Sequence, residues 1–233
     1  MRILRNLIRK IKYNLKFLGK SADLDFSYIV NAKNDQTLKK LMDYYGSDKG
    51  GKNNHHNFTD YYSEIFYSKR QSVKNFLEVG LGTNNENIPS NMGRSGKPLA
   101  SIRAWRDYFT NAQIFGADID HKILKNETRI TTHYVDQTDP VSIKKMYDYF
   151  GVDKFDVILE DGLHEFSANI IFFENSIDYL DEKGTYIIED IYYKDQKKFI
   201  NYFKKSNYQF YMIDLYHKQN IANNCLIIIK KNG

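Results

Sequence analysis

The alternation of short apolar runs with helical patterns, from residue 73 onward, constrains the fold of this chain more than any other feature. Helix candidates lie near 99–109, 140–150, 167–180 and 193–204, each with apolar side chains three or four residues apart. Strands that alternate with helices form parallel sheets, because each strand returns to the sheet through a helix. The pattern predicts an α/β fold with helices on both faces of a seven-stranded, mostly parallel sheet, whose strands occupy 75–80, 113–118, 130–135, 155–160, 184–189, 209–215 and 225–230.

The last two strands are expected to pair differently. Only the polar stretch 216–224 separates them, which is too short for a crossover helix. Antiparallel strands need no such helix. The sequence therefore predicts an antiparallel hairpin at the C-terminal edge of the sheet.

The formal net charge of +5 is concentrated at the N-terminus. The first twenty residues hold seven basic side chains and no acid, whereas the remainder has a slight excess of acids, which argues against a nucleic-acid-binding body. Apolar residues near helical spacing predict a basic amphipathic helix, within a segment 1–34 that includes a linker. We expect this helix to pack on its own domain or on another subunit of a homo-oligomer; the alternative is contact with an anionic membrane surface.

The cysteine content and the hydropathy of the sequence indicate the cellular compartment of the protein. Cys225 is the single cysteine and lies in an apolar run, which indicates a core thiol in a reducing compartment. Basic residues interrupt the apolar positions of the first twenty residues too often for a secretory signal, and nothing resembles an apolar run of about 18 residues or more. The expected location is the cytoplasm, without a transmembrane helix.

Polar and glycine residues follow each of the first three predicted strands, where open α/β sheets bind ligands. The motif E-x-G-x-G lacks the third glycine of a dinucleotide fingerprint. It suits a cofactor without a phosphate, because glycines let the backbone approach and an acid after the second strand can accept ribose hydroxyls. The candidates are Glu78, Gly80 and Gly82 after the first strand, Asp118 and Asp120 after the second, and Asp136 and Gln137 after the third.

Three acids follow the next two strands: Asp161 after the fourth, and Glu189 with Asp190 after the fifth. Like charges brought to one edge of a sheet are costly unless a cation or protons neutralise them. Oxygen ligands favour Mg²⁺ or Mn²⁺, and no cysteine or histidine cluster has zinc spacing. The sequence predicts a divalent-metal site here; the alternative is a set of solvated loop charges.

Residues 73–190 resemble the S-adenosylmethionine-binding core of class I methyltransferases, which have a Rossmann-like fold. The resemblance implies a methyltransferase domain over 73–233, preceded by a helical cap region over 35–72. It also implies that Gly80 and Gly82 line the methionine end of the cofactor, that Asp118 holds the ribose, and that Asp136 and Gln137 flank the adenine. Asp120 is a competing ribose ligand, for which helix capping is the alternative.

The spacing of Asp161, His164, Glu189 and Asp190 is similar to that of metal-dependent O-methyltransferases that act on sugar hydroxyls, such as the macrolide-sugar enzymes. Further likeness lies in YYGSDKG (44–50), HHNFTDYYSEIF (55–66) and ASIRAWRDYFTNAQIFGADI (100–119), whereas the loop 84–98 departs from this branch. The resemblance implies that Asp161 belongs to the catalytic centre and that His164 is the general base, since its ordinary pKa suits proton acceptance near neutral pH.

The polar segment before the first strand is expected to cover cofactor and substrate. Ser47 and Lys49 are candidate cofactor contacts, and Asp48, His55 and Tyr61 are further candidates; a flexible surface loop is the alternative. Trp105 and Tyr108 are expected in the core or at an interface rather than as sugar platforms.

The expected function is O-methylation of a small sugar substrate, with S-adenosylmethionine and Mg²⁺ or Mn²⁺ as cofactors. We expect a sugar nucleotide, such as a GDP-heptose used for a bacterial capsule or other surface polysaccharide. The enzyme alternatives are methylation of a macrolide glycoside, a catechol or a small phosphate metabolite. A non-catalytic cofactor-binding scaffold is the alternative from another class.

Overall fold

The computed structural model describes residues 36–51, 56–215, 217, 220 and 222–232. The predicted basic helix and linker (1–34) and the candidate His55 lie outside the described residues. Within the described part of the chain, no helix is both long enough and apolar enough to cross a membrane.

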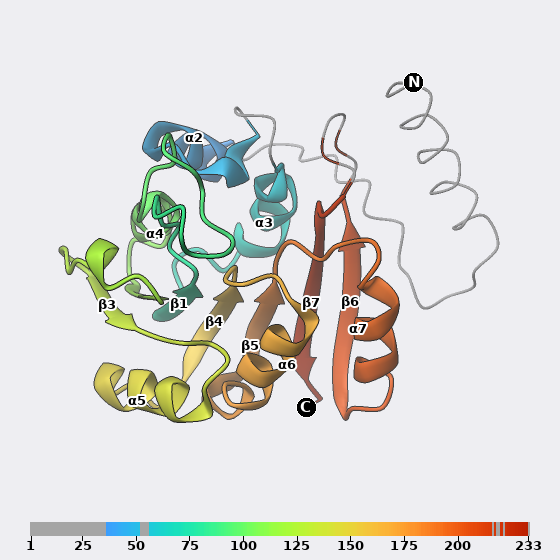
Figure 1. The fold of residues 1–233 in the computed structure, drawn as a ribbon. Coiled ribbons are helices and arrows are strands. Elements are labelled where there is room, and N and C mark those ends of the chain that lie inside the picture. Colours follow the sequence, from blue (N-terminus) through green and yellow to red (C-terminus); the bar gives the residue numbers. More distant parts are fainter. Residues whose placement is uncertain (1–35, 52–55, 216, 218–219, 221, 233) are drawn as a thin grey trace, which may run out of the picture.

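The sheet has seven strands in the order β3-β2-β1-β4-β5-β7-β6 (Figure 1). Strands β1 to β5 run parallel, and β7 is antiparallel to both β5 and β6, which confirms the predicted sheet and its C-terminal hairpin. The strand order reverses between β1 and β4, so a crevice is expected outside their carboxyl ends. The strands are β1 (Asn75–Val79), β2 (Gln113–Asp118), β3 (Ile130–Tyr134), β4 (Phe155–Glu160), β5 (Leu180–Ile188), β6 (Tyr208–Asp214) and β7 (Cys225–Lys231).

Three helices follow the parallel strands on one face: α5 (Pro140–Phe150), α6 (Phe166–Glu174) and α7 (Gln196–Phe203). Their apolar side chains pack on one set of alternate strand residues, which includes Leu77 of β1. Local sequence sets the bounds of α5. Asp139 caps its first turn by accepting a hydrogen bond from Val141 N, and Gly151 ends it in the left-handed conformation. The helix predicted over 167–180 ends at Glu174 and is followed by a 3₁₀ turn, Ile177–Tyr179.

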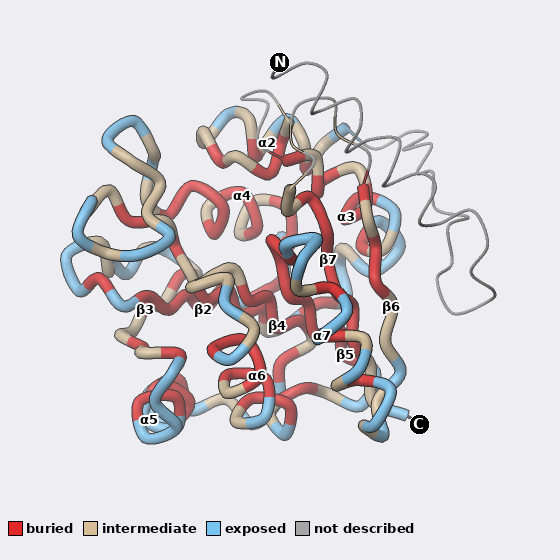
Figure 2. The backbone as a smooth tube through the Cα atoms, turned by 45° about the vertical axis from the view of Figure 1, so that its right-hand side comes forward, coloured by how far each residue is buried: buried red, intermediate tan, exposed pale blue. Residues whose placement is uncertain are grey.

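The opposite face is covered by α4 (Ala100–Tyr108) together with α2 (Thr37–Tyr45) and α3 (Phe58–Phe66) of the predicted cap segment. Trp105 lies at the centre of this layer, with its ring stacked on Phe109 and edge-on to Tyr62 and Phe66. Trp105 and Tyr108 are fully buried, so both belong to the core rather than to a sugar platform. Figure 2 shows the buried strands enclosed between the two layers.

The cap segment therefore shares its apolar core with the sheet. A 3₁₀ turn, Asp48–Gly50, lies between α2 and α3 in the chain. Its residues Asp48 and Lys49 line a pocket at the carboxyl ends of the strands. This packing brings residues from near position 50 onto strand ends that come more than a hundred residues later.

Candidate functional site

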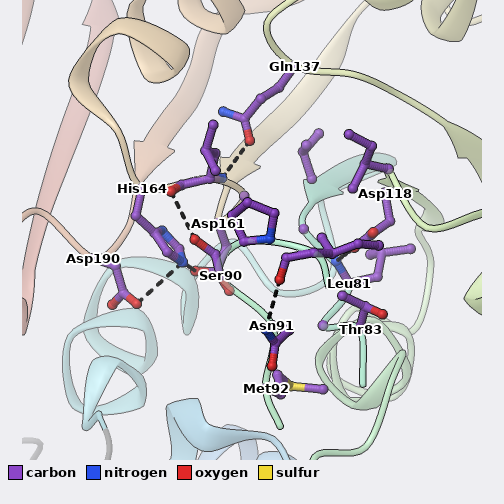
Figure 3. A pocket seen from close by; sticks show the side chains of 18 of the residues that line it. Leu81, Thr83, Ser90, Asn91, Met92, Asp118, Gln137, Asp161, His164 and Asp190 are labelled. Atoms are coloured by element: carbon purple, nitrogen blue, oxygen red, sulfur yellow. Dashed lines mark hydrogen bonds and ion pairs between the residues drawn. The ribbon is translucent and has the colours of Figure 1, made fainter. Parts of the chain in front are cut away.

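A pocket of about 1460 Å³ lies at the carboxyl ends of β1 to β5. Pockets for a single small ligand measure roughly 300–1,000 Å³, so this pocket has room for a cofactor and an acceptor together. Most of the predicted site residues line it, and Glu78, Asp120, Glu189 and Tyr61 do not. Those that do are Ser47, Asp48, Lys49, Gly80, Gly82, Asp118, Asp136, Gln137, Asp161, His164 and Asp190. Figure 3 labels Asp118, Gln137, Asp161, His164 and Asp190 among them.

Asp118 and Asp120 have different roles at the end of β2. Asp118 lines the pocket, and its carboxylate accepts hydrogen bonds from Leu81 N (2.7 Å) and Asp120 N (2.8 Å). Burial raises the pKa of Asp118. Asp120 instead caps the 3₁₀ turn His121–Ile123 and accepts a hydrogen bond from Thr83. Asp120 is thus the helix cap that the alternative interpretation predicted, and Asp118 is the acid presented to a ligand.

Gly80 allows the loops after β1 and β4 to touch. It has a φ of 90°, and a Cβ added there would lie 2.0 Å from the backbone oxygen of Asp161. Gly82, with a φ of 75°, is crowded by the side chain of Met92 instead. The first glycine therefore positions the strand end that carries Asp161, whereas the second borders the pocket beneath a flexible side chain.

Gln137, in the loop after β3, holds the loop after β4 through hydrogen bonds. Its Oε1 accepts a hydrogen bond from Leu163 N (2.7 Å), and its Nε2 donates to Glu160 (2.8 Å). Glu160 is fully buried, and this burial raises its pKa to about 8. Gln137 thus supports the segment that presents His164. No role for Glu160 was predicted from the sequence, because the burial of an acid at the end of a strand becomes visible only in the fold.

Asp161, His164 and Asp190 form the one group among the described residues whose potential metal ligand atoms all lie within 4.8 Å of one another. His164 Nε2 is 3.9 Å from Asp161 Oδ1 and 3.7 Å from Asp190 Oδ2. His164 and Asp190 have φ values of 59° and 57°, a left-handed conformation that non-glycine residues adopt at a cost. Burial lowers the pKa of His164, against the opposing effect of Asp161, which favours the neutral imidazole.

Glu189 is not part of this group. It is fully buried, and its carboxylate accepts hydrogen bonds from Lys49 Nζ and from the hydroxyl of Tyr62. Both partners come from the cap segment. The structure thus separates the adjacent acids: Asp190 faces the pocket with Asp161 and His164, and Glu189 faces the cap. Whether Glu189 binds metal stays a prediction.

Lys49 is the buried cation of the site. Its Nζ pairs with Asp161 Oδ2 and Glu189 Oε2, and lies 3.6 Å from Glu78 Oε1. Burial opposes its positive charge, but these carboxylates outweigh burial and raise the pKa of Lys49 well above its ordinary value. Burial also raises the pKa of Asp161, yet Lys49 and His164 bring it below its ordinary value. Lys49 was predicted as a cofactor contact, and the structure places its ammonium among the acids.

His56 is a site residue that the sequence analysis missed. Its Nδ1 lies 3.3 Å from Asp190 Oδ1 and 3.3 Å from Asn224 Oδ1. It thus joins the cap to the residue before β7 and to the group of Asp161, His164 and Asp190, which we call the metal-binding group after the predicted ion. Burial lowers its pKa to about 4, which keeps the ring neutral. The histidine doublet at 55–56 was the available signal, but the prediction selected His55.

The loop 84–98 forms a wall of the pocket that the sequence analysis did not assign. Ser90 Oγ donates a hydrogen bond to the backbone oxygen of Leu163 (2.9 Å), and Met92 lies against Gly82. Figure 3 shows Met92, Thr83 and Asp118 apart from His164 and Asp190, with Asp161 between the two sets. The pocket therefore has one end near β1–β3, where a cofactor was predicted, and another after β4 and β5, where a metal ion was predicted. We call them the cofactor end and the metal-binding end after these predictions.

No family model matches the sequence. The chain is 30% identical over 147 residues to the 8-demethyl-8-alpha-L-rhamnosyl tetracenomycin-C 2'-O-methyltransferase of Streptomyces olivaceus, covering 63% of this chain and 35% of that protein. It is 31% identical over 163 residues to the demethylmacrocin O-methyltransferase of Streptomyces fradiae, covering 70% and 38%. The chain thus spans less than half the length of these relatives.

The matches to solved structures cover more of this chain than the sequence relatives do. The MycE methyltransferase of the mycinamycin biosynthetic pathway, in complex with Mg, SAH and mycinamycin VI, has a TM-score of 0.63 at 22% identity, covering 86% of this chain and 56% of that one. The SAH-bound methyltransferase PaMTH1 of Podospora anserina has a TM-score of 0.53 at 9% identity, covering 92% of this chain and 100% of that one. These likenesses, with the observed strand order, show that the chain has the Rossmann-like fold of the methyltransferases.

Proposed function

We propose that the protein transfers a methyl group from S-adenosylmethionine to a sugar hydroxyl with the help of a divalent metal ion. One observation carries the proposal: Asp161, His164 and Asp190 converge within a pocket whose other end is bordered by Gly82, Asp118 and Asp136. The names of the curated relatives, which are O-methyltransferases of a rhamnosyl tetracenomycin-C and of demethylmacrocin, support it.

The cofactor end fits S-adenosylmethionine. The backbone at Gly82 borders the pocket without a Cβ, and Asp118 offers a carboxylate for ribose hydroxyls. Its two oxygens already accept backbone hydrogen bonds, but each retains a further lone pair. Asp136 lines the pocket farther along this end, where an adenine would lie.

The metal-binding end fits a hard divalent cation, because two carboxylates and an imidazole converge there. Mg²⁺ or Mn²⁺ bound to Asp161 and Asp190, with Glu189 as the further predicted ligand, would lower the pKa of a sugar hydroxyl. His164 would accept the hydroxyl proton, since its lowered pKa favours the unprotonated imidazole. S-adenosylmethionine would supply the methyl group: its S–C bond would break as the new O–C bond forms, the O–H proton would pass to His164, and S-adenosylhomocysteine would leave.

For the substrate, we propose a sugar nucleotide such as a GDP-heptose destined for a surface polysaccharide. A macrolide glycoside is the second candidate, because one curated relative is named for demethylmacrocin and a solved neighbour is in complex with mycinamycin VI. Labelled S-adenosylmethionine, incubated with the protein, Mg²⁺ and both substrate classes, tests the proposal. Label on a sugar nucleotide that disappears with EDTA is the expected result; label on the macrolide alone would contradict the substrate, and no label on any sugar would contradict the function.

The proposed cellular context is the cytoplasm, with the protein as a homo-oligomer and its basic N-terminal segment in contact with a subunit or, alternatively, a membrane surface. Sedimentation of the purified full chain, with and without anionic vesicles, tests both expectations. A monomer would contradict the first, and co-sedimentation with vesicles would favour the membrane alternative.

A further inference from the structure

Two aromatic rings and two lysines line the pocket beyond the metal-binding group, and we call Tyr192, Lys194, Phe166 and Lys198 the acceptor rim. Lys194 Nζ lies 5.3 Å from the ring centroid of Tyr192, and Lys198 Nζ lies 5.9 Å from that of Phe166. Tyr192 is 38% exposed, although most aromatic side chains among the described residues are buried. Each ring is thus paired with an ammonium group and remains accessible from the pocket.

The strand order places the acceptor rim on the far side of the metal-binding group from the cofactor end. Asp118 and Asp136 follow β2 and β3, whereas Tyr192 follows Asp190 by two residues after β5, and Phe166 begins α6 after β4. A substrate hydroxyl held beside Asp161 and Asp190 would therefore leave the rest of the acceptor at this rim.

We propose that the acceptor rim binds the nucleoside diphosphate portion of the acceptor, an inference that rests on the proposed sugar O-methylation. An aromatic face stacks a nucleobase, and lysine ammonium groups bind phosphate as point charges. Lys198 is held by Asp195 Oδ1 at 2.7 Å, which positions its ammonium while leaving donors for a phosphate oxygen. A neutral aglycone would offer no matching charge to Lys194, whereas Lys198 already pairs with Asp195.

Acidic side chains also line this end, and they set the orientation of such a ligand. Glu165 and Asp195 lie beside the rim and would repel a diphosphate. The phosphates must therefore contact Lys194 and Lys198 directly rather than a diffuse positive surface. Substitution of these two lysines therefore tests the proposal directly.

The test measures binding of GDP and UDP by calorimetry to the full chain loaded with SAH, in EDTA, so that the nucleotide cannot bind through a metal ion. The variants are Tyr192→Ala and the double change Lys194→Ala with Lys198→Ala. The matched control is Lys197→Ala. Lys197 is exposed and belongs to α7 like Lys198, but it does not line the pocket. We expect each rim variant to weaken nucleotide binding at least 10-fold, while SAH affinity and the control stay within 2-fold.

Absence of GDP and UDP binding to the unaltered protein, or equal binding to the rim variants and the control, would overturn the inference. These failures are distinguishable from failure of the proposed function, because metal-dependent methyl transfer to a sugar without a nucleotide would still uphold sugar O-methylation. With a sugar nucleotide as acceptor, the rim variants should raise its KM at least 10-fold with kcat and the KM for S-adenosylmethionine nearly unchanged.

Discussion

Asp161 divides its two carboxylate oxygens between Lys49 and His164. Oδ2 accepts a hydrogen bond from Lys49 Nζ, and Oδ1 lies 3.9 Å from His164 Nε2. The cap lysine thus holds one oxygen and leaves the other facing the group that includes Asp190. If Asp161 binds the predicted metal ion, Lys49 would tune both the geometry and the charge of this ligand.

Replacing Lys49 by Met should destabilise the protein strongly, because it leaves buried carboxylates without their cation. Breaking a buried ion pair from one side costs about 3–5 kcal/mol in the free energy of unfolding. Urea denaturation at neutral pH measures this change. Lys144→Met is the control, since that lysine forms an exposed pair with Asp148 and its loss should have no measurable effect. Equal stability of the two variants would show that Lys49 is not a structural counter-ion.

Asp190→Asn should abolish Mn²⁺ binding with the fold retained. Asparagine tolerates the left-handed backbone that Asp190 adopts, so the substitution removes charge without adding strain. Titration with Mn²⁺ followed by electron paramagnetic resonance measures the affinity. Asp136→Asn, at the cofactor end of the same pocket, should bind Mn²⁺ like the unaltered protein. Metal binding by Asp190→Asn within 3-fold of that value would contradict the assigned metal group.

The substitution His164→Asn distinguishes a general base from a metal ligand at this position. Asparagine also tolerates the backbone φ of 59°, so the substitution adds no strain. If His164 accepts the substrate proton, kcat should fall by roughly 10² or more, while the affinities for SAH and Mn²⁺ stay nearly unchanged. Single-turnover kinetics with labelled cofactor measures the chemical step. A loss of Mn²⁺ affinity that matches the loss of activity would make His164 a ligand instead.

Gly80→Ala should unfold or severely destabilise the protein, because the new Cβ would lie 2.0 Å from the backbone oxygen of Asp161. Gly93→Ala is the matched control. It also has a positive φ, 67°, but a Cβ there meets nothing within 4 Å, so only the conformational cost of about 1 kcal/mol applies. Thermal melting of both variants shows the difference. Equal melting temperatures would mean that the loops after β1 and β4 separate without cost.

Glu160→Gln should remove a pH dependence of stability. The folded protein holds the pKa of Glu160 near 8, against an ordinary 4.5, so between these values the folded state binds a proton that the unfolded state has released. Stability from this group is fully present below pH 4.5 and is lost as the pH rises toward 8, by up to about 1.4 kcal/mol per pH unit. Gln keeps the acceptor for Gln137 and Asn169. Urea denaturation measures the free energy of unfolding of both proteins from pH 5 to 8. The stability of the variant relative to the unaltered protein should increase as the pH rises. A difference in the free energy of unfolding that stays constant with pH would contradict the raised pKa.

The sequence by itself determined the strands, their direction and the residues at their carboxyl ends. Apolar periodicity is a local property, and parallel strands joined by helices bring their ends to one edge of a sheet whatever the details of packing. Asp118 and Asp161 could be placed at one rim for this reason. The spacing of His164 from Asp161 was equally visible, because both belong to one loop.

Only the tertiary structure decided which acid faces which partner. Glu189 and Asp190 are adjacent in sequence, yet one meets Lys49 and Tyr62 of the cap and the other meets His56 and His164. The choice depends on the left-handed backbone at Asp190 and on a cap that packs through its apolar core on strands more than a hundred residues away. Contacts between segments so distant in the chain have no local sequence signal, since they form only when the shared core brings the two surfaces together.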